Sequence, residues 1–475
     1  MIAACGVIKM DRYKKLALNT VIFAIGTFSS KVLVFLLMPI YTRILSPADY
    51  SVVELVTGTA NFMIPIVAVC IGEGVIRFGL DSAVRKDDVF TSGILTVLIG
   101  FAVFAACYPL FSMIPFITGY TPLVYLFVLA SSLKGICAQF VRAKGYIRLF
   151  AFDGVLSTVM VLVFNILGLV VFKLGITGYV LAIILADILS ALFLTWIAGL
   201  WRYFKGFSVN KAVWRAMVLY AIPLIPNTLF FWVTNLSDRY IVTGLLGAEI
   251  NGLYSIAYKI PTIITAVSSI FMQAWQLSAF SEEDTRTKAR FYSTVFDGYQ
   301  SVLFIIGAGT VLLIKPLTSL LLDQEYYTSW VYVPYLILSV VFSCFASFFS
   351  SIYMSQKRNV MTMITTMTGA AINIVLNFIL IPIYGANGAA FATFISYFVV
   401  FVFRALHSRR YIPVHVAWGR LALNLLLLLG LALTAILEPR YSIAMQIAFA
   451  VALVLVNAKT MITSLVRILE RRRAG

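Results

Sequence analysis

Fourteen apolar stretches constrain the fold of this chain more than any other feature of its sequence. A transmembrane helix needs about 20 mostly apolar residues, and a helix satisfies its own backbone hydrogen bonds inside a bilayer. The stretches lie at about 17–38, 52–72, 89–111, 122–140, 151–172, 178–200, 216–236, 252–274, 294–315, 333–353, 360–382, 388–406, 418–437 and 442–460. With 61% hydrophobic and 12% charged residues, the chain has too little polar surface for a soluble globule. We therefore predict an all-α integral membrane protein with about 14 transmembrane helices.

The chain repeats itself after about 200 residues. Residues 237–273 follow the plan of residues 39–72: a helix end, a short loop with Gly or Pro and an acidic residue, and an apolar helix that begins near a tyrosine. A second match joins residues 173–182 to residues 383–392. Self-similarity at a fixed offset indicates two homologous halves.

The duplication predicts the domain organisation. We expect an N-terminal six-helix lobe at 1–205, a C-terminal six-helix lobe at 206–410, and two extra transmembrane helices with a basic tail at 411–475. Because six spans are an even number, the second half enters the membrane from the same side as the first. The two lobes are therefore expected to form a parallel repeat, related by an axis along the membrane normal.

Lysine and arginine mark one side of the membrane, because cytoplasmic connections retain them. The amino end, every second connection and the carboxyl tail together hold 28 of the 36 basic residues. The other side holds Arg43, Lys173, Arg239, Lys315 and Arg440. We predict that both termini are cytoplasmic. This pattern explains the net charge of +17, and no nucleic-acid partner is expected.

The sequence lacks the motifs of an enzyme. Its five cysteines have no CxxC spacing and predict neither a disulfide framework nor a metal site. His407 and His415 lie in a basic connection without carboxylates or cysteines beside them. The GxG at 72–74 is not followed by the strand and helix of a nucleotide site, and there is no Walker lysine. We therefore expect no catalysis, no cofactor and no metal.

Two lysines inside apolar spans are the first candidates for a binding site. Lys31 lies in the first span and Lys259 in the eighth. A charge at the centre of a bilayer costs about 2.5 to 3.5 kcal/mol on insertion scales, so such residues mark functional sites by default. The alternative for Lys31 is an amine that snorkels toward the outer interface, and for Lys259 it is an internal ion pair. The positions of Ser255, Lys259, Thr262 and Ser269 predict a polar stripe on one helix face.

Other intramembrane polar residues support more than one interpretation. Glu54 and Asn61 share one face of the second span, where Glu54 is interpreted as a structural partner, a proton carrier or a substrate contact. For Asp238 and Arg239 the simpler interpretation is a local salt bridge at the end of the seventh span. Lys134 in the fourth span and Asp187 in the sixth are weaker candidates for lining a pathway.

Four short motifs carry a resemblance to a known family over about residues 13–410. They are TRILSPADY at 42–50, NLSDRY at 235–240, GLYSIAYK at 252–259 and QAWQ at 273–276. In order and spacing they resemble the multidrug, oligosaccharidyl-lipid and polysaccharide exporter superfamily. Within it the chain is similar to the polysaccharide transporter branch, which includes Wzx-type oligosaccharide flippases. Ser51 departs from the glycine that is usual there, which affects the local loop geometry alone.

The resemblance implies a flippase in the bacterial cytoplasmic membrane. Such a protein moves an undecaprenyl-diphosphate-linked oligosaccharide from the inner to the outer leaflet by alternating access. Its partners would be the lipid-linked substrate, membrane lipids and the polysaccharide polymerase machinery. Lys31 and Lys259 would contact the diphosphate as point charges, and Asn61, Tyr254 and Tyr258 would contact the sugar. The driving force is left open among a coupling proton, a coupling sodium ion, the membrane potential and consumption of the product outside.

Three alternatives remain at this stage. A drug or cation antiporter of the same superfamily would carry a carboxylate in an early helix, where this chain has Lys31. A lipid II flippase would have a cavity richer in arginine. A structural protein without transport activity is hard to reconcile with intramembrane charges and a parallel duplication.

Overall fold

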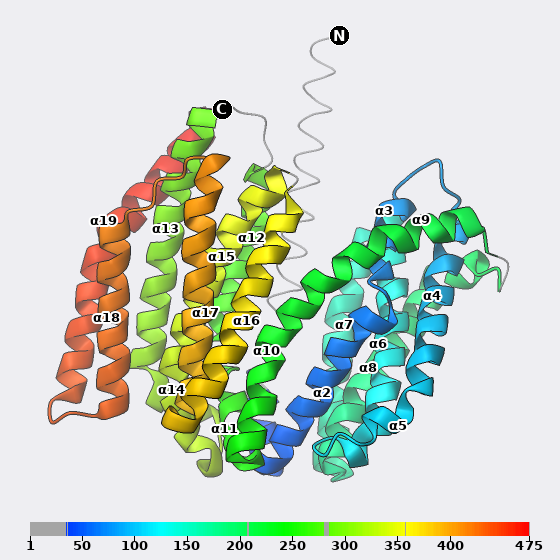
Figure 1. The fold of residues 1–475 in the computed structure, drawn as a ribbon, viewed down its shortest axis with the longest axis horizontal. Coiled ribbons are helices and arrows are strands. Elements are labelled where there is room, and N and C mark those ends of the chain that lie inside the picture. Colours follow the sequence, from blue (N-terminus) through cyan, green and yellow to red (C-terminus); the bar gives the residue numbers. More distant parts are fainter. Residues whose placement is uncertain (1–34, 36, 207–208, 280–284, 357, 475) are drawn as a thin grey trace. The chain divides into compact units, whose positions relative to one another are not determined.

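The computed structural model describes every residue except 1–34, 36, 207–208, 280–284, 357 and 475 (Figure 1). Every regular element in that part of the chain is a helix, which confirms the all-α prediction. The chain divides into two compact units, Met1–Leu236 and Ser237–Gly475, which are called here the N-terminal and C-terminal units. They are defined by packing, so the repeat boundaries at 205 and 410 stay predictions.

The N-terminal unit consists of helices joined by short turns. In chain order they are α2 (Pro47–Val67), α3 (Ile71–Gly79), α4 (Lys86–Ala106), α5 (Tyr108–Phe111), η1 (Thr118–Tyr120), α6 (Thr121–Ala143), α7 (Ile147–Asn165), η2 (Ile166–Val171), α8 (Gly175–Ile197), η3 (Leu200–Tyr203), α9 (Lys211–Ala221), η4 (Ile222–Leu224) and the first part of α10 (Ile225–Leu246). The element η2 is a π-helix that continues α7.

The start of α2 shows how the local sequence sets a helix end. Ser46 is the N-cap: its side chain accepts from the backbone N–H of Asp49 at 3.2 Å, and the Asp49 carboxylate accepts from the Ser46 N–H at 3.4 Å. Pro47 occupies the first helical position, where its fixed φ fits and no N–H is needed. This capping box fixes where the second span begins.

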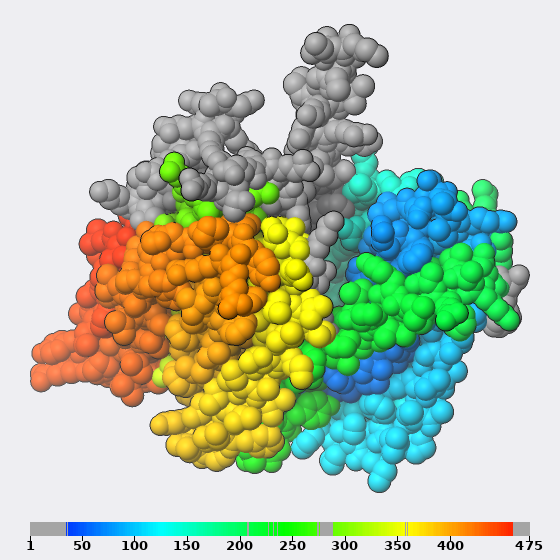
Figure 2. All heavy atoms as spheres, turned by 45° about the horizontal axis from the view of Figure 1, so that its top comes forward, coloured from blue at the N-terminus to red at the C-terminus, as the bar shows by residue number. Residues whose placement is uncertain are grey.

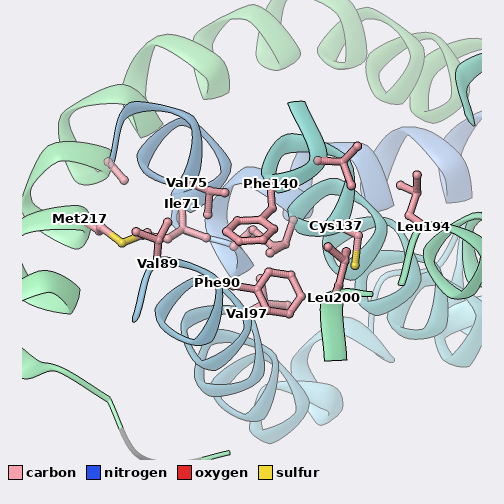
Figure 3. Packing of buried hydrophobic residues seen from close by; sticks show 14 residues of the cluster. Ile71, Val75, Val89, Phe90, Val97, Cys137, Phe140, Leu194, Leu200 and Met217 are labelled. Carbon is pink, nitrogen blue, oxygen red and sulfur yellow. The ribbon is translucent and has the colours of Figure 1, made fainter. Parts of the chain in front are cut away.

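The core of the N-terminal unit gathers apolar side chains from helices that are far apart in the sequence (Figure 3). Ile71 and Val75 of α3 pack with Phe90 of α4, Phe140 of α6 and Met217 of α9. Met217 is completely buried, so α9 belongs to this core although it begins the seventh predicted span. Burial of such side chains anchors α3 and α9 within the unit.

The C-terminal unit contains the remaining helices. They are the second part of α10, α11 (Ala248–Ala257), α12 (Thr262–Ala279), α13 (Thr285–Leu312), α14 (Ile314–Leu321), η5 (Gln324–Tyr332), α15 (Val333–Ser355), α16 (Asn359–Tyr384), α17 (Ala386–His407), η6 (Ser408–Arg410), α18 (Trp418–Leu437) and α19 (Ser442–Ala474). Phenylalanine, tyrosine and tryptophan side chains from α12, α13, α15 and α17 fill its core. Phe348, for example, stacks on Trp275 with ring centroids 4.8 Å apart.

Equivalent glycines occupy equivalent places in the two units. A Cβ atom at Gly178 of α8 would lie 2.8 Å from the Gly168 carbonyl oxygen, and one at Gly388 of α17 would lie 2.2 Å from the Leu380 carbonyl oxygen. In each unit two successive helices therefore touch backbone to backbone beside a glycine. These glycines match in the sequence repeat, so the close approach is a shared feature of the two halves.

Within the described residues, eleven helices are long and apolar enough to cross a membrane, and a bent pair, Ala248–Ala257 with Thr262–Met272, makes up to twelve spans. These correspond in order to the second through thirteenth predicted stretches. The predicted stretch at 442–460 coincides with α19, whose described apolar part, Ser442–Ala458, is shorter than the spans above. The first predicted stretch, 17–38, lies almost entirely outside the described residues.

Helices α18 and α19 form a hairpin that packs on α13. They lie side by side in both views, coloured orange to red (Figure 2). Asn424 and Asn457 are fully buried between them and exchange two amide hydrogen bonds, at 3.0 and 2.7 Å. At the start of α18, Arg420 forms an ion pair with Asp297 of α13 at 2.6 Å. Polar contacts therefore position a hairpin whose outer surface is largely apolar.

Candidate functional site

The structure places the predicted site residues in both units. Lys31 lies outside the described residues. The N-terminal unit holds Glu54, Asn61 and Lys134, whereas the C-terminal unit holds Arg239, Tyr254, Tyr258 and Lys259. Of the latter, Arg239, Tyr254 and Tyr258 lie around one buried carboxylate.

That carboxylate belongs to Asp238 of α10, which is completely buried. Its Oδ2 atom accepts hydrogen bonds from the hydroxyl groups of Tyr254 at 2.9 Å and Tyr258 at 3.1 Å. The two tyrosine rings meet edge to face with centroids 5.3 Å apart. We call Asp238, Tyr254 and Tyr258 the Asp238 cluster. Several donors on one oxygen stabilise a charge that would otherwise be costly to bury.

Arg239 adds a positive charge beside the cluster. Its backbone N–H donates to Asp238 Oδ1 at 2.8 Å, and its guanidinium carbon lies 5.3 Å from the centre of the Tyr258 ring. The sequence placed the end of the seventh span at 236, but α10 continues to Leu246. The helix ends there because Gly247 adopts φ +94°. Asp238 and Arg239 therefore lie inside a helix rather than at its end.

Lys259 lies at a bend in the eighth predicted span. Helices α11 and α12 meet at 42° with Tyr258–Pro261 between them, so the expected continuous helix at 252–274 was wrong. Pro261 explains the break, because it has no N–H for the helical ladder. The carbonyl of Lys259 accepts instead from the backbone N–H of Thr262 at 3.2 Å and from its hydroxyl at 2.5 Å. The polar stripe expected along one helix face is thus divided at the bend.

A buried amide network extends the Asp238 cluster, and sequence reasoning missed it. Asn373 of α16 donates to the Thr393 hydroxyl at 3.1 Å and accepts from Ser237 at 3.3 Å. Asn377 donates to Asn373 at 3.1 Å, and its own Oδ1 accepts from no described residue. The sequence feature that could have revealed this network is a pair of asparagines four residues apart in an apolar span. Tyr258 hydrogen-bonds Thr393 and so joins this network to the cluster.

Glu54 is a buried acid of the N-terminal unit, with 6% of its surface exposed. It accepts a hydrogen bond from the hydroxyl of Tyr50, one helical turn earlier in α2, at 3.0 Å. Tyr41 packs against Tyr179 of α8 with centroids 4.7 Å apart, and also contacts Tyr50 at 6.5 Å. Each unit therefore buries a carboxylate that accepts a hydrogen bond from tyrosine.

Asn61 and Gly58 of α2 have local packing roles in this structure. The Asn61 amide donates to the Thr57 carbonyl of its own helix at 2.9 Å. A Cβ atom at Gly58 would lie 2.5 Å from the Leu236 side chain, so α2 and α10 pack closely there.

Lys134 forms an ion pair with Asp187 in the N-terminal unit. Its Nζ lies 2.8 Å from Asp187 Oδ1 and donates to the Ser157 hydroxyl at 2.6 Å, while Ser131 donates to the other carboxylate oxygen. Asp153, which the sequence analysis did not single out, is 3% exposed and accepts from Ser190 at 2.5 Å. Helices α6, α7 and α8 thus share one lysine and two carboxylates. In this state the charge of Lys134 is neutralised by Asp187.

Comparison with known proteins identifies the family. The model of the polysaccharide biosynthesis protein family matches residues 16–276, which is more than half of the chain. No curated protein sequence matches the chain.

Solved structures show the same fold at low sequence identity. A lipid II flippase, MurJ, in an inward closed conformation aligns with TM-score 0.68 and 13% identity, over 95% of this chain and 100% of its own. An inward-facing multidrug resistance MATE family transporter of the MOP superfamily aligns with TM-score 0.66 and 15% identity, over 82% and 98%. A MOP superfamily transporter from Pyrococcus furiosus aligns with TM-score 0.56 and 14% identity, over 83% and 95%. The protein described here therefore belongs to the polysaccharide biosynthesis protein family and has the fold of the MOP superfamily, as the sequence motifs predicted.

Proposed function

We propose that this protein is a flippase that moves an undecaprenyl-diphosphate-linked oligosaccharide, a repeat unit of a polysaccharide, O-antigen or capsule, across the bacterial cytoplasmic membrane by alternating access. Membership in the polysaccharide biosynthesis family supports a lipid-linked substrate. The observation that carries the proposal is the position of Lys259, at a bend in a membrane span and next in sequence to Tyr258 of the Asp238 cluster. A cation at a break inside the membrane is the feature that an anionic head group requires.

Lys259 and Lys31 are the proposed diphosphate contacts. An ammonium group on a flexible stem neutralises phosphate charge without demanding one geometry, so it can follow a moving substrate. Arg239 is proposed as a third cation, because its guanidinium lies over Tyr258 beside the same bend. Lys134 is proposed to join the pathway only when its pair with Asp187 opens.

Tyr254, Tyr258, Asn61 and Glu54 are the proposed polar contacts of the sugar. The hydroxyl groups of both tyrosines donate to Asp238 in this state. Sugar hydroxyls would therefore compete with Asp238 for these donors, and the ring faces would stack on the sugar. Such an exchange would link substrate binding to the charge state of the cluster.

A proton or sodium ion is proposed as the coupling ion. Carboxylate, amide and hydroxyl oxygens from α10, α16 and α17 gather at Asp238, Asn373, Asn377 and Thr393. Oxygen atoms buried together in a membrane protein suit a small cation, and Asp238 alone suits a proton. Glu54 is the corresponding candidate in the N-terminal unit.

The finer topology is part of the same proposal. We infer 14 spans: the twelve candidates, the stretch at 17–38 and α19. Two parallel six-helix repeats, at 1–205 and 206–410, would form the lobes, and 411–475 would supply the extra helices. Both termini are proposed to be cytoplasmic, with the polysaccharide polymerase machinery as a further partner.

Two related functions are the alternatives. The lipid II flippase aligns over 95% of this chain, whereas the multidrug transporter aligns over 82%. The greater coverage favours a lipid-carrier substrate over an organic cation. A lipid II substrate itself would place a different head group on the same lysines.

Translocation of lipid-linked oligosaccharide in reconstituted vesicles tests the proposal. The native chain is compared with Lys259→Ala and Lys31→Ala at matched protein content. Lys211→Ala is the control, because Lys211 is exposed at the start of α9 and is not part of the Asp238 cluster. We expect the native chain and the control to flip the lipid and both test variants to lose most activity. Export of an organic cation without lipid movement would replace the proposal with the antiporter.

A further inference from the structure

The second predicted span is broken between α2 and α3 by two residues in the left-handed region. Val69 has φ +52° and Cys70 has φ +49°. Residues other than glycine rarely adopt these angles, and a β-branched residue such as valine is an outlier there. The break is therefore strained at a place where most helices use glycine.

The backbone at the break keeps its hydrogen bonds. The N–H of Val69 donates to the Ile66 carbonyl at 3.1 Å, and the N–H of Cys70 donates to the Pro65 carbonyl at 3.1 Å. Ala68 and Ile71 also donate, to Ile64 and Ala68 at 2.8 Å. This is the bond pattern of a Schellman helix end, with valine in the position that glycine normally takes. The cost of the break is thus backbone strain rather than lost hydrogen bonds.

The local sequence does not require a break. Residues 68–70 are Ala-Val-Cys, with neither glycine nor proline, and the sequence predicted one apolar helix over 52–72. Packing supplies the cause. The carbonyl oxygen of Val67 lies so close to α4 that a Cβ atom at Gly100 would be 1.9 Å away. The Cys70 sulfur lies 3.9 Å from the Thr228 hydroxyl of α10.

Both sides of the break are packed in the N-terminal unit, since Val53 and Val56 of α2 are also completely buried. Helix α3 is anchored, since Ile71 and Val75 are completely buried in the core of the N-terminal unit. Helix α2 carries Glu54 and Asn61, two of the proposed substrate contacts. Straightening at 68–70 would therefore change the angle between α2 and α3. At residues 68–70 the local sequence favours a continuous helix, whereas packing favours the break. A segment under such opposing preferences can adopt two conformations.

We propose that residues 68–70 form a strained hinge, which is left-handed in this state and becomes helical in a second state of the transport cycle. The inference rests on the proposed function, because alternating access supplies the two states. Release of the strain at Val69 and Cys70 favours the straight form, while the fit of Val67 against Gly100 favours the broken form. The hinge positions Glu54 and Asn61 in each state.

A distance between spin labels at residues 52 and 80 tests the hinge. The labels are attached through an unnatural amino acid so that Cys70 is retained. A continuous helix places the two positions about 42 Å apart, at 1.5 Å per residue, and a break shortens the distance. We expect a short and a long population in the native protein, with proportions that change when lipid-linked oligosaccharide is added.

Three variants separate strain from general helix weakening. Val69→Gly relieves the left-handed strain, so the ratio of short to long distances should rise by a factor of about 5 to 30. Ala68→Gly is the control, because Ala68 is right-handed with φ −80° in this structure and glycine there weakens both states alike. Gly100→Ala should act in the opposite direction and enrich the long distance.

The outcomes separate the hinge from the proposed function. A single short distance under all conditions, or equal shifts from Val69→Gly and Ala68→Gly, would overturn the hinge even if the native protein flips the lipid. Two populations that respond to Val69→Gly in a protein that does not flip the lipid would support the hinge and contradict the proposed function.

Discussion

Lys134 and Asp187 form an ion pair, with 2.8 Å between Nζ and Oδ1, that ties α6 to α8 inside the N-terminal unit. The side chains are 23% and 10% exposed, so each charge depends largely on the other. Lys134→Met would leave the Asp187 carboxylate without its cation. We expect the free energy of unfolding to fall by about 3 kcal/mol in this variant. Unfolding in detergent micelles, followed by circular dichroism, measures the loss.

The double variant Lys134→Met with Asp187→Leu is the matched comparison. It removes both charges, so we expect it to recover most of the stability. The single variant Asp187→Leu completes the comparison. If the double variant loses as much free energy of unfolding as Lys134→Met and Asp187→Leu together, the two charges do not interact and the ion pair is not formed in the folded protein.

Tyr254 is expected to stabilise the Asp238 carboxylate. Tyr254→Phe removes one of the two tyrosine hydroxyls that donate to Asp238 Oδ2, at a completely buried site. A hydrogen bond to a charged group contributes about 1.5 to 3 kcal/mol, so the stability should fall by about that amount. Tyr332→Phe serves as the control: the Tyr332 ring lies 6.0 Å from Tyr254, and its hydroxyl is not part of the Asp238 cluster. Equal losses in the two variants would show that the loss of a buried hydroxyl in general, not the bond to Asp238, is responsible.

Gly178 and Gly388 are expected to tolerate no side chain. Alanine at either position would place a Cβ atom within 2.8 or 2.2 Å of a backbone oxygen, which forces the helix hairpin apart. We expect each variant to lose about 1 to 3 kcal/mol of stability or more. Gly154→Ala in α7 is the control, since nothing lies within 4 Å of its Cβ position, and alanine there should be neutral or stabilising. Thermal unfolding in micelles compares the three, and equal behaviour would contradict the close approach.

Asn424 and Asn457 should show a measurable coupling. Their exchanged amide hydrogen bonds lie between two apolar helices, where each lost partner leaves a buried polar group. Asn424→Leu and Asn457→Leu, alone and together, make a double-mutant cycle. We expect a coupling energy of about 0.6 to 2 kcal/mol, the range of polar contacts between membrane helices. Strictly additive losses would mean that the two amides act independently.

Much of the fold was predictable from the sequence because the bilayer imposes a simple rule. A stretch of about 20 apolar residues must become a helix, so the described spans follow the predicted ones in order. The capping box at Ser46 and Asp49 is local. The bend at Lys259 was not predicted, although its cause, Pro261, is also a local feature. The family motifs could also be recognised in the sequence, because they are short runs of adjacent residues.

Part of the candidate site was predictable for the same reason. A charge or an amide in an apolar span stands out, as Lys259, Lys134 and Glu54 did. The roles of these residues stay predictions. Asp153, Asn373 and Asn377 were missed although each also lies in an apolar span, because the sequence does not show which polar groups meet across helices.

The sequence by itself therefore determined that the chain is helical, spans a membrane and belongs to its family, since these properties depend on residue type along short segments. The tertiary structure alone decided the pairing of Lys134 with Asp187, the convergence of Tyr254 and Tyr258 on Asp238, and the break at Val69. Each of these depends on groups that the sequence holds far apart or on packing that overrides a local preference. Val69 shows this most clearly: the sequence predicted a continuous helix over 52–72, yet Val69 adopts φ +52° where Val67 packs against Gly100 of α4.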